Sequence, residues 1–225
     1  MHFGVAIDAR RQQVVDVFHY KGVVTSGTVW NLSRVPPEPH LPLTSDQPLE
    51  TDRLLIRAVE ATDLVALLNV NGDDEVTQYL PYASWQHMDD ARAWLARMTA
   101  MQASGTALQL VIVDKVLAIA IGTVLLFRYE QLSERAELGY VLGRAYWGQG
   151  VMREALHAVI AHAFGPLPVR RLEAEVDPRN MRSGHVLKTL GFVMEGLLRQ
   201  RWLTKGEPCD INVFGLLRHE WRGTV

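Results

Sequence analysis

The residues best suited to bind an anion lie in Trp147-Gly148-Gln149-Gly150, between a strand-like segment and a helix-like segment. Two glycines one residue apart let the backbone turn sharply and approach a ligand closely. The first amides of the following helix are free donors at its positive end, so together they suit a phosphate. The positive charge of Arg153 in the first turn is unfavourable beside the positive end of the helix dipole, and a phosphate bound there would compensate for it. A loop glycine pair with a solvated arginine is an equally good interpretation, and the spacing matches neither Gly-x-Gly-x-x-Gly nor a Walker loop.

Asn180 and Ser183 open the next helix-like segment. Asn180 is a typical N-cap residue, which would make Ser183 an ordinary helical serine, and for these residues alone this interpretation is favoured. Gly184 inside the helix costs about 1 kcal/mol relative to alanine. Either a ligand against that turn or a closely packed neighbour would explain the glycine.

Other reactive side chains give weaker signals. His157 and His162 are five residues apart, so they do not share a helix face as a metal pair would, and we expect both to be exposed. Glu173 and Glu175 alternate along a strand and point to one side, where they either meet a cationic substrate or are solvated. Cys209 is the one cysteine, which excludes an intramolecular disulfide and a cysteine zinc site.

The elements that position these residues alternate between strands and helices in the middle of the chain. Apolar residues at a period of 3.6 predict a helix over residues 151–164, and Gly191 ends a helix over 181–190. Tyr82 and Trp85 precede a helix, where they line an acceptor cleft or pack against other residues. Strands are predicted at 54–57, 108–113, 116–127, 136–142, 171–176, 193–203 and 210–217, with further helices from Thr62 or Asp63 and over about 89–101. The strand–helix–strand crossover over 136–176 predicts a mixed sheet.

A proline-dense stretch divides the chain. Residues 36–48 hold five of the ten prolines and predict an extended linker. We therefore expect residues 1–48 to form an N-terminal arm with its linker and residues 49–225 to form the main domain. Within the arm, the β-rich segments 14–20 and 23–30 predict a hairpin.

Length and composition bound the class of protein. The chain has 225 residues, a length that suits one domain plus an extension or two small domains. Its net charge of -2 argues against a nucleic-acid binder held by phosphate contacts. The longest uncharged apolar stretch, 116–127, is shorter than the ~20 residues of a membrane helix. With no signal peptide in the sequence, we expect a cytoplasmic protein without a membrane partner.

Several different motifs follow one another along the main domain, and together they resemble those of one family. They are Leu49-Glu50-Thr51-Asp52-Arg53-Leu54-Leu55-Ile56-Arg57, Glu137-Leu138-Gly139-Tyr140-Val141-Leu142, Trp147-Gly148-Gln149-Gly150 with Glu154-Ala155-Leu156, Asn180 with Ser183, Leu190-Gly191-Phe192 with Glu195-Gly196, and Leu216-Leu217-Arg218-His219-Glu220-Trp221. Residues 49–221 thereby resemble the GNAT acetyltransferase superfamily, in its branch of ribosomal-protein N-terminal acetyltransferases of the RimJ/RimL type.

The resemblance implies an α/β (α+β) fold with a splayed, mixed central sheet flanked by helices, here with an N-terminal extension. It also implies acetyl-CoA as co-substrate, without a metal. The backbone of Tyr140, Val141 and Leu142 would accompany the pantetheine arm, Asn180 would contact that arm, and Ser183 would lie near the sulfur. The pyrophosphate would bind Gly148, Gln149, Gly150, Val151, Met152 and Arg153.

This sequence departs from the superfamily pattern at three positions. Trp147 stands where glutamine or arginine usually opens the loop, as is common in this branch. Met152 replaces a small residue, which is tolerable only if its side chain points into the core. Leu187 replaces the tyrosine that protonates the leaving thiolate, so Ser183 becomes the nearest substitute.

The implied reaction is direct attack of a primary amine on acetyl-CoA in a ternary complex. An N-terminal α-amine, with a pKa of about 7.7–8.0, is partly neutral at pH 7, whereas a lysine amine near 10.4 is not, so a peptide or protein N-terminus is the expected acceptor. Glu137 is the candidate base, unless it is only a solvent-facing strand residue, and an amide near Leu142 would polarise the carbonyl. The alternatives are acetylation of a small amine, such as a polyamine or aminoglycoside, and a non-catalytic acetyl-CoA-binding module. A homodimer is a further expectation.

Overall fold

A computed structural model describes residues 3–8, 13–20, 23–31, 48–105 and 107–223. The chain divides into two compact units, Met1–Glu38 and Pro39–Val225. In the first unit, strands β1 (Phe3–Asp8), β2 (Gln13–Tyr20) and β3 (Val23–Asn31) form an antiparallel sheet in the order β1-β2-β3. The hairpin predicted in the arm is confirmed as β2–β3, and β1 was not predicted. The linker over 36–47 and the turn at Lys21-Gly22 lie outside the described residues.

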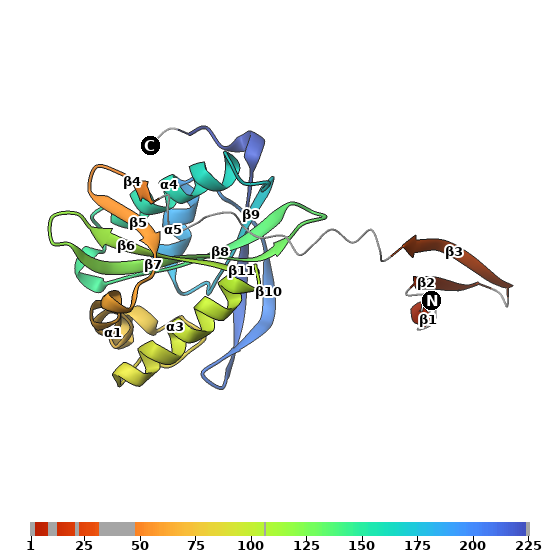
Figure 1. Cartoon of the computed structure of the whole chain (residues 1–225), viewed down its shortest axis with the longest axis horizontal. Coiled ribbons are helices and arrows are strands. Elements are labelled where there is room, and N and C mark those ends of the chain that lie inside the picture. Colours follow the sequence, from red (N-terminus) through yellow and green to blue (C-terminus); the bar gives the residue numbers. More distant parts are fainter. Residues whose placement is uncertain (1–2, 9–12, 21–22, 32–47, 106, 224–225) are drawn as a thin grey trace. The chain divides into compact units, whose positions relative to one another are not determined.

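The second unit is built on one mixed sheet of eight strands in the order β10-β11-β9-β8-β7-β6-β5-β4 (Figure 1). Its strands are β4 (Leu49–Glu50), β5 (Leu54–Ala58), β6 (Ala107–Asp114), β7 (Ile119–Glu130), β8 (Arg135–Leu142), β9 (Arg171–Val176), β10 (Val193–Thr204) and β11 (Glu207–Leu217). Strands β8 and β9 pair in parallel, and the other described neighbours pair antiparallel. The predicted mixed sheet is confirmed.

Helices cover the two faces of this sheet (Figure 1). They are α1 (Leu64–Asn71), α2 (Asp74–Thr77), α3 (Met88–Ala103), α4 (Val151–Phe164) and α5 (Met181–Thr189). Helices α4 and α5 pack on one face with the main apolar core, and α1 and α3 pack on the other face with a smaller core. Alternation along β6 feeds both cores, because Ile112 belongs to the first and Val111 to the second. Among the described residues, no helix is long and apolar enough to cross a membrane.

The loop before α3 contributes to the smaller core. Trp85 is buried and its ring lies 5.4 Å from that of Trp94. The Tyr82 hydroxyl donates a hydrogen bond of 2.9 Å to the side-chain oxygen of Asn71. Tyr82 and Trp85 therefore pack against other residues, which is one of the two interpretations that the sequence left open.

Strands β8 and β9 separate partway along their length. Their described register runs from Arg135↔Arg171 to Glu137↔Glu173, although β8 continues to Leu142 and β9 to Val176. The segments beyond Glu137 and Glu173 therefore present strand edges that face a gap in the sheet. Helix α4 follows β8 and helix α5 follows β9, so both helix starts lie at the end where this gap opens.

Candidate active site

The glycine loop has the backbone geometry that its sequence predicts. Gly148 and Gly150 both have φ of +74°, in the left-handed region that favours glycine. Gly150 is the N-cap of α4, and the first intrahelical bond joins the Glu154 amide to the Gly150 carbonyl at 3.0 Å. The preceding amides of the first turn therefore have no partner within the helix. The Trp147 indole donates to the Leu142 carbonyl at 2.8 Å, which fixes the loop to the end of β8.

A contact that local sequence patterns do not reveal holds this loop in place. The Arg53 guanidinium, in the turn between β4 and β5, forms an ion pair of 2.6 Å with Glu154 and donates to the Gln149 carbonyl at 3.1 Å. The Thr51 hydroxyl also donates to Glu154. Burial alone raises the pKa of Glu154, but the hydrogen bonds from Thr51 and Arg53 lower it overall. The negative charge of Glu154 is thus compensated by Arg53. The start of α4 therefore stays favourable for an external anion.

The side chains of the first turn of α4 divide between core and solvent. Val151 and Met152 are buried, so the Met152 side chain points into the core as the departure from the family pattern required. Arg153 is exposed. The Arg182 guanidinium lies over the Trp147 ring at 4.7 Å from the centroid, which brings a further positive charge to the glycine loop.

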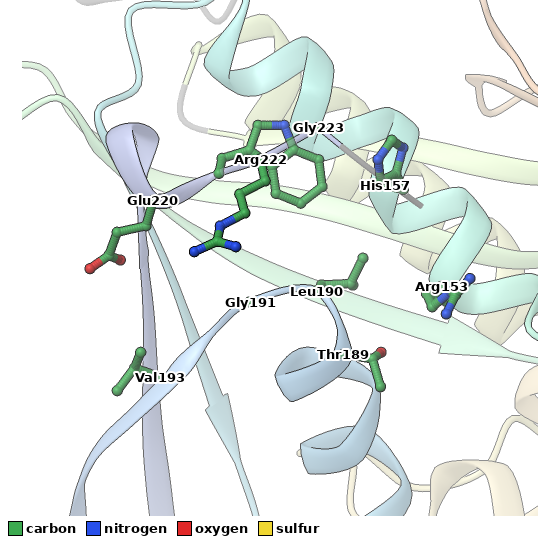
Figure 2. Close-up of a pocket in the computed structure, with 10 residues that line it drawn as sticks. Arg153, His157, Thr189, Leu190, Gly191, Val193, Glu220, Arg222 and Gly223 are labelled. Carbon is green, nitrogen blue, oxygen red and sulfur yellow. The ribbon is translucent and has the colours of Figure 1, made fainter.

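A pocket of about 370 Å³ adjoins the start of α4. Figure 2 shows its labelled residues reaching in from α4, from the end of α5 and from the C-terminal segment, with Arg153 and Arg222 among them. The His157 ring packs against the Trp221 ring at 4.9 Å.

The expectation that His157 and His162 are exposed was wrong. The Nε2 atoms of both are buried without a hydrogen-bond partner among the described residues. Burial lowers the pKa of His162, which favours its neutral form. Trp221, near the far end of the chain, covers the His157 ring.

The start of α5 brings two hydroxyl groups together. The Asn180 side-chain oxygen accepts from the Ser183 amide at 3.1 Å, so the predicted cap is confirmed. The Ser183 hydroxyl lies 2.7 Å from the hydroxyl of Tyr140 on β8. Burial raises the pKa of Tyr140 to about 12. A Cβ added at Gly184 would lie 3.6 Å from the Phe214 ring, which is an ordinary contact, so packing against Phe214 does not require the glycine.

Leu187 is fully buried in the apolar core and contributes no polar group to the site. The position at which the resemblance places a tyrosine acid is therefore part of the packing of α5 against the sheet. The hydroxyls of Tyr140 and Ser183 are instead the polar groups that the structure brings together at this helix start.

Glu137 lies on the opposite face of the sheet from Tyr140. Along β8, Ala136 and Leu138 face the core beneath α4, so the intervening Glu137 faces away from it. Its side chain is only 12% exposed and forms an ion pair of 2.8 Å with Arg128. Burial raises the pKa of Glu137, and the neighbouring Arg128 offsets part of that rise.

Sequence reasoning missed Arg128, which lies at an irregularity in β7. Its φ of +50° coincides with the register shift between Phe127 and Glu130. Its guanidinium lies 5.3 Å from the centroid of the Trp202 ring, so an aromatic face and Glu137 both hold it. A bulge of this kind re-aims a side chain that would otherwise follow the strand pleat.

Glu173 and Glu175 share the face of Glu137, as the alternation along β9 predicts. Glu173 forms ion pairs of 2.7 Å with Arg135 and 2.8 Å with Arg171. Glu175 lies 3.6 Å from Arg201. These carboxylates are therefore neutralised by arginines of the chain itself.

The arrangement suits transfer of a group through the gap between β8 and β9. Amides at the end of the gap suit an anionic group, and the free strand edges suit an extended chain with amide groups. The hydroxyl pair of Tyr140 and Ser183 lies on one face of the sheet, and the Glu137 carboxylate lies on the other. A donor molecule and an acceptor can therefore meet from opposite faces.

Comparison with known proteins agrees with this geometry. The profile of the family described as "Acetyltransferase (GNAT) domain" matches residues 53–193. The N-acetyltransferase p20 of Bacillus licheniformis, named as uncharacterized, is 35% identical over 175 residues, covering 78% of this chain and 98% of that protein. A ribosomal-protein-S5-alanine acetyltransferase from Vibrio fischeri has a structure with a TM-score of 0.69 and 25% identity, covering 79% of this chain and 100% of that one. The spermidine N-acetyltransferase of Vibrio cholerae, solved with CoA and spermine, shares the fold at 20% identity and a TM-score of 0.66, covering 76% of this chain and 98% of that one.

The chain belongs to the GNAT acetyltransferase family. It is an acetyl-CoA-dependent N-acetyltransferase with the mixed α/β fold of that family, and its relatives include ribosomal-protein acetyltransferases.

Proposed function

We propose that this enzyme acetylates the N-terminal α-amine of a protein or peptide. The observation that carries the proposal is the position of one largely buried carboxylate, Glu137, at the point where β8 and β9 separate, facing away from the Tyr140–Ser183 hydroxyl pair. A single weak base suffices for an α-amine, whose pKa of about 7.7–8.0 leaves a useful neutral fraction at pH 7.

Acetyl-CoA binds with its pyrophosphate on the loop over residues 148–153 and its pantetheine arm beside Tyr140, Val141 and Leu142. The unpaired amides at the start of α4 support the first placement, and the free edge of β8 supports the second. The amide nitrogen of Asn180 faces the pantetheine, since its oxygen is occupied by the cap. The pocket that begins at Arg153 gives the adenosine end a concave surface with positive charge.

Transfer begins when the neutral amine attacks the thioester carbonyl, whose developing negative charge an amide near Leu142 stabilises. The carbon–sulfur bond then breaks, and its electron pair leaves with the sulfur. Glu137 takes the proton of the amine through water, and Ser183 stabilises the thiolate. Strong acid help is dispensable because a thiol's pKa of ~8.5 is close to the working pH.

The paired charges around Glu137 favour an N-terminus over a polyamine. A polyamine carries several positive charges and is best held by carboxylates that lack partners of their own. Here Glu137, Glu173 and Glu175 each lie against an arginine. The acceptor surface therefore has little net negative charge to offer a polycation.

Release of free CoA thiol, measured with an acceptor panel, tests this proposal. The panel contains a peptide with a free N-terminus, the same peptide with its α-amine blocked but a lysine present, and spermidine. We expect thiol release with the first peptide alone and a product carrying its acetyl group on the α-amine. Equal or faster release with spermidine or with the blocked peptide would contradict the proposed acceptor.

Replacing Arg128 by methionine is expected to shift the acid limb of kcat/KM to higher pH. Burial raises the pKa of Glu137 and Arg128 lowers it, so removing the guanidinium leaves the raising effect unopposed. A base must be ionised to act, so its activity then disappears at a higher pH as the pH falls. Arg135→Met, which removes the partner of Glu173 instead, is the matched control and should leave the limb unchanged. An unmoved limb in Arg128→Met would show that Glu137 is not the group that titrates.

A chain beginning at Thr44 is expected to bind acetyl-CoA as tightly as the full chain. The chain divides into two compact units between Glu38 and Pro39, and the match to the family begins only at residue 53. Calorimetry compares the two affinities, and light scattering reports whether the arm's strands pair with a second copy. Loss of coenzyme binding by a folded, truncated chain would place the arm in the active site.

A further inference from the structure

The hydroxyl of Tyr140 is an enclosed polar group whose hydrogen-bond partners among the described residues both belong to Ser183. Its oxygen lies 2.7 Å from the Ser183 hydroxyl and 3.2 Å from the Ser183 carbonyl oxygen. Tyr140 stands on β8, and Ser183 lies in the first turn of α5. The two side chains therefore join the sheet to the helix where the proposed function places the coenzyme sulfur.

The single hydrogen of the phenol can serve only one of these acceptors at a time. When Tyr140 donates to the carbonyl, the Ser183 hydroxyl can donate its own hydrogen back to the phenol oxygen. When Tyr140 donates to the Ser183 hydroxyl oxygen, the serine hydrogen is released toward a different acceptor. The direction of the phenol hydrogen thus decides whether Ser183 has a hydrogen to offer.

A developing thiolate favours the second arrangement. Hydrogen bonds to charged acceptors are roughly twice as strong as those between neutral groups, and donors linked in a chain strengthen one another. Burial raises the pKa of Tyr140 to about 12, so the phenol keeps its hydrogen throughout the pH range in which amines are acetylated. Tyr140 therefore remains a donor and does not become a proton source.

We propose that Tyr140 is a positioning residue that turns the Ser183 hydroxyl toward the leaving sulfur. The proposal rests on the proposed function, which places that sulfur beside Ser183. As the carbon–sulfur bond breaks and its electron pair passes to sulfur, Ser183 donates a hydrogen bond to the thiolate and Tyr140 donates one to Ser183. Neither side chain loses its proton, the amine's proton goes to Glu137, and solvent later protonates the thiolate. Strand β8 thus supplies the tyrosine hydroxyl that Leu187 does not.

The pKa of the CoA thiol in its complex with the full chain reports this network without any acceptor amine. Ultraviolet absorbance follows the thiolate, and the spectrum of the complex with desulfo-CoA is subtracted to remove the protein's own tyrosines. We expect the wild-type enzyme to hold the thiol pKa below that of free CoA. Ser183→Ala should raise the thiol pKa by about 1 and Tyr140→Phe should raise it by about 0.5. The double variant should have the same thiol pKa as Ser183→Ala alone.

Steady-state kinetics give the second measurement. Ser183→Ala is expected to lower kcat about 10–100-fold and Tyr140→Phe about 3–10-fold, with KM for acetyl-CoA little changed. In the Ser183→Ala background, Tyr140→Phe should have no effect, because it acts only through Ser183. Tyr82→Phe removes another enclosed phenol with a pKa of about 12, in the smaller core, and is the matched control with unchanged kcat.

Two results would overturn the positioning role. One is an unchanged thiol pKa in Tyr140→Phe, and the other is an equal loss of kcat on removing the phenol with or without Ser183. If no amine is acetylated, the proposed function fails, whereas the thiol titration still decides the role of Tyr140.

Discussion

Replacing Glu137 by glutamine is expected to lower kcat at pH 7 by roughly 10²–10⁴-fold, the range typical of a lost general base. Glutamine keeps the shape of the side chain and can still accept a hydrogen bond from Arg128, so the fold is retained. The loss should shrink as pH rises, because an α-amine with a pKa of about 7.7–8.0 then deprotonates without help. A pH–rate profile of both enzymes with the true acceptor measures both effects.

Glu173→Gln provides the matched control for this substitution. Glu173 pairs with Glu137 in the strand register, lies on the same face of the sheet and is also held by arginines. Its replacement should leave kcat within about threefold of wild type, since a surface ion pair contributes little. Full activity of Glu137→Gln at pH 7 would show that Glu137 is only a strand residue and that the base lies elsewhere.

Replacing Gly150 by valine is expected to weaken acetyl-CoA binding about 10–100-fold, the cost of losing hydrogen bonds to a charged group. A β-branched residue is strained at the φ of +74° that Gly150 adopts, so the loop must move and the first amides of α4 lose their alignment. Calorimetry measures the affinity, and circular dichroism checks that the fold persists.

Gly206→Val separates backbone strain from loss of the binding site. Gly206 has φ of +87° in the turn between β10 and β11, and a Cβ added there would meet nothing within 4 Å. Both variants should therefore lose similar stability, and only Gly150→Val should lose affinity for the coenzyme. If a folded Gly150→Val enzyme bound acetyl-CoA with unchanged affinity, the pyrophosphate would not bind at the glycine loop.

Local patterns in the sequence predict most of the elements around the site. The apolar period over 151–164 gives helix α4 with its observed bounds, and the alternation over 171–176 gives β9. The glycine pair predicts a sharply turning loop, and both glycines adopt a positive φ there. These features depend on residues within one or two turns of each other, so periodicity and turn chemistry are sufficient. The four-residue helix α2 was missed because it is too short to show a period.

The contacts that complete the site join residues far apart in the sequence. Arg53 and Glu154 are separated by 101 positions, and Tyr140 and Ser183 by 43. Arg128 reaches Glu137 only because a bulge in β7 turns it out of the strand pleat. No local pattern encodes such pairs: the crossover from β8 to β9 brings Tyr140 to Ser183, and the turn between β4 and β5 brings Arg53 to α4. The burial of His157 likewise depends on a residue distant in the sequence, since Trp221 covers it from the end of the chain.

A crystal structure of the full chain with acetyl-CoA tests the central claim most directly. We expect the pyrophosphate on the amides at residues 148–153, the pantetheine in the gap between β8 and β9, and the sulfur within hydrogen-bonding reach of Ser183. We also expect the thioester carbonyl to be accessible from the face that carries Glu137. Coenzyme density outside this gap, or a thioester closed off from Glu137, would contradict the account.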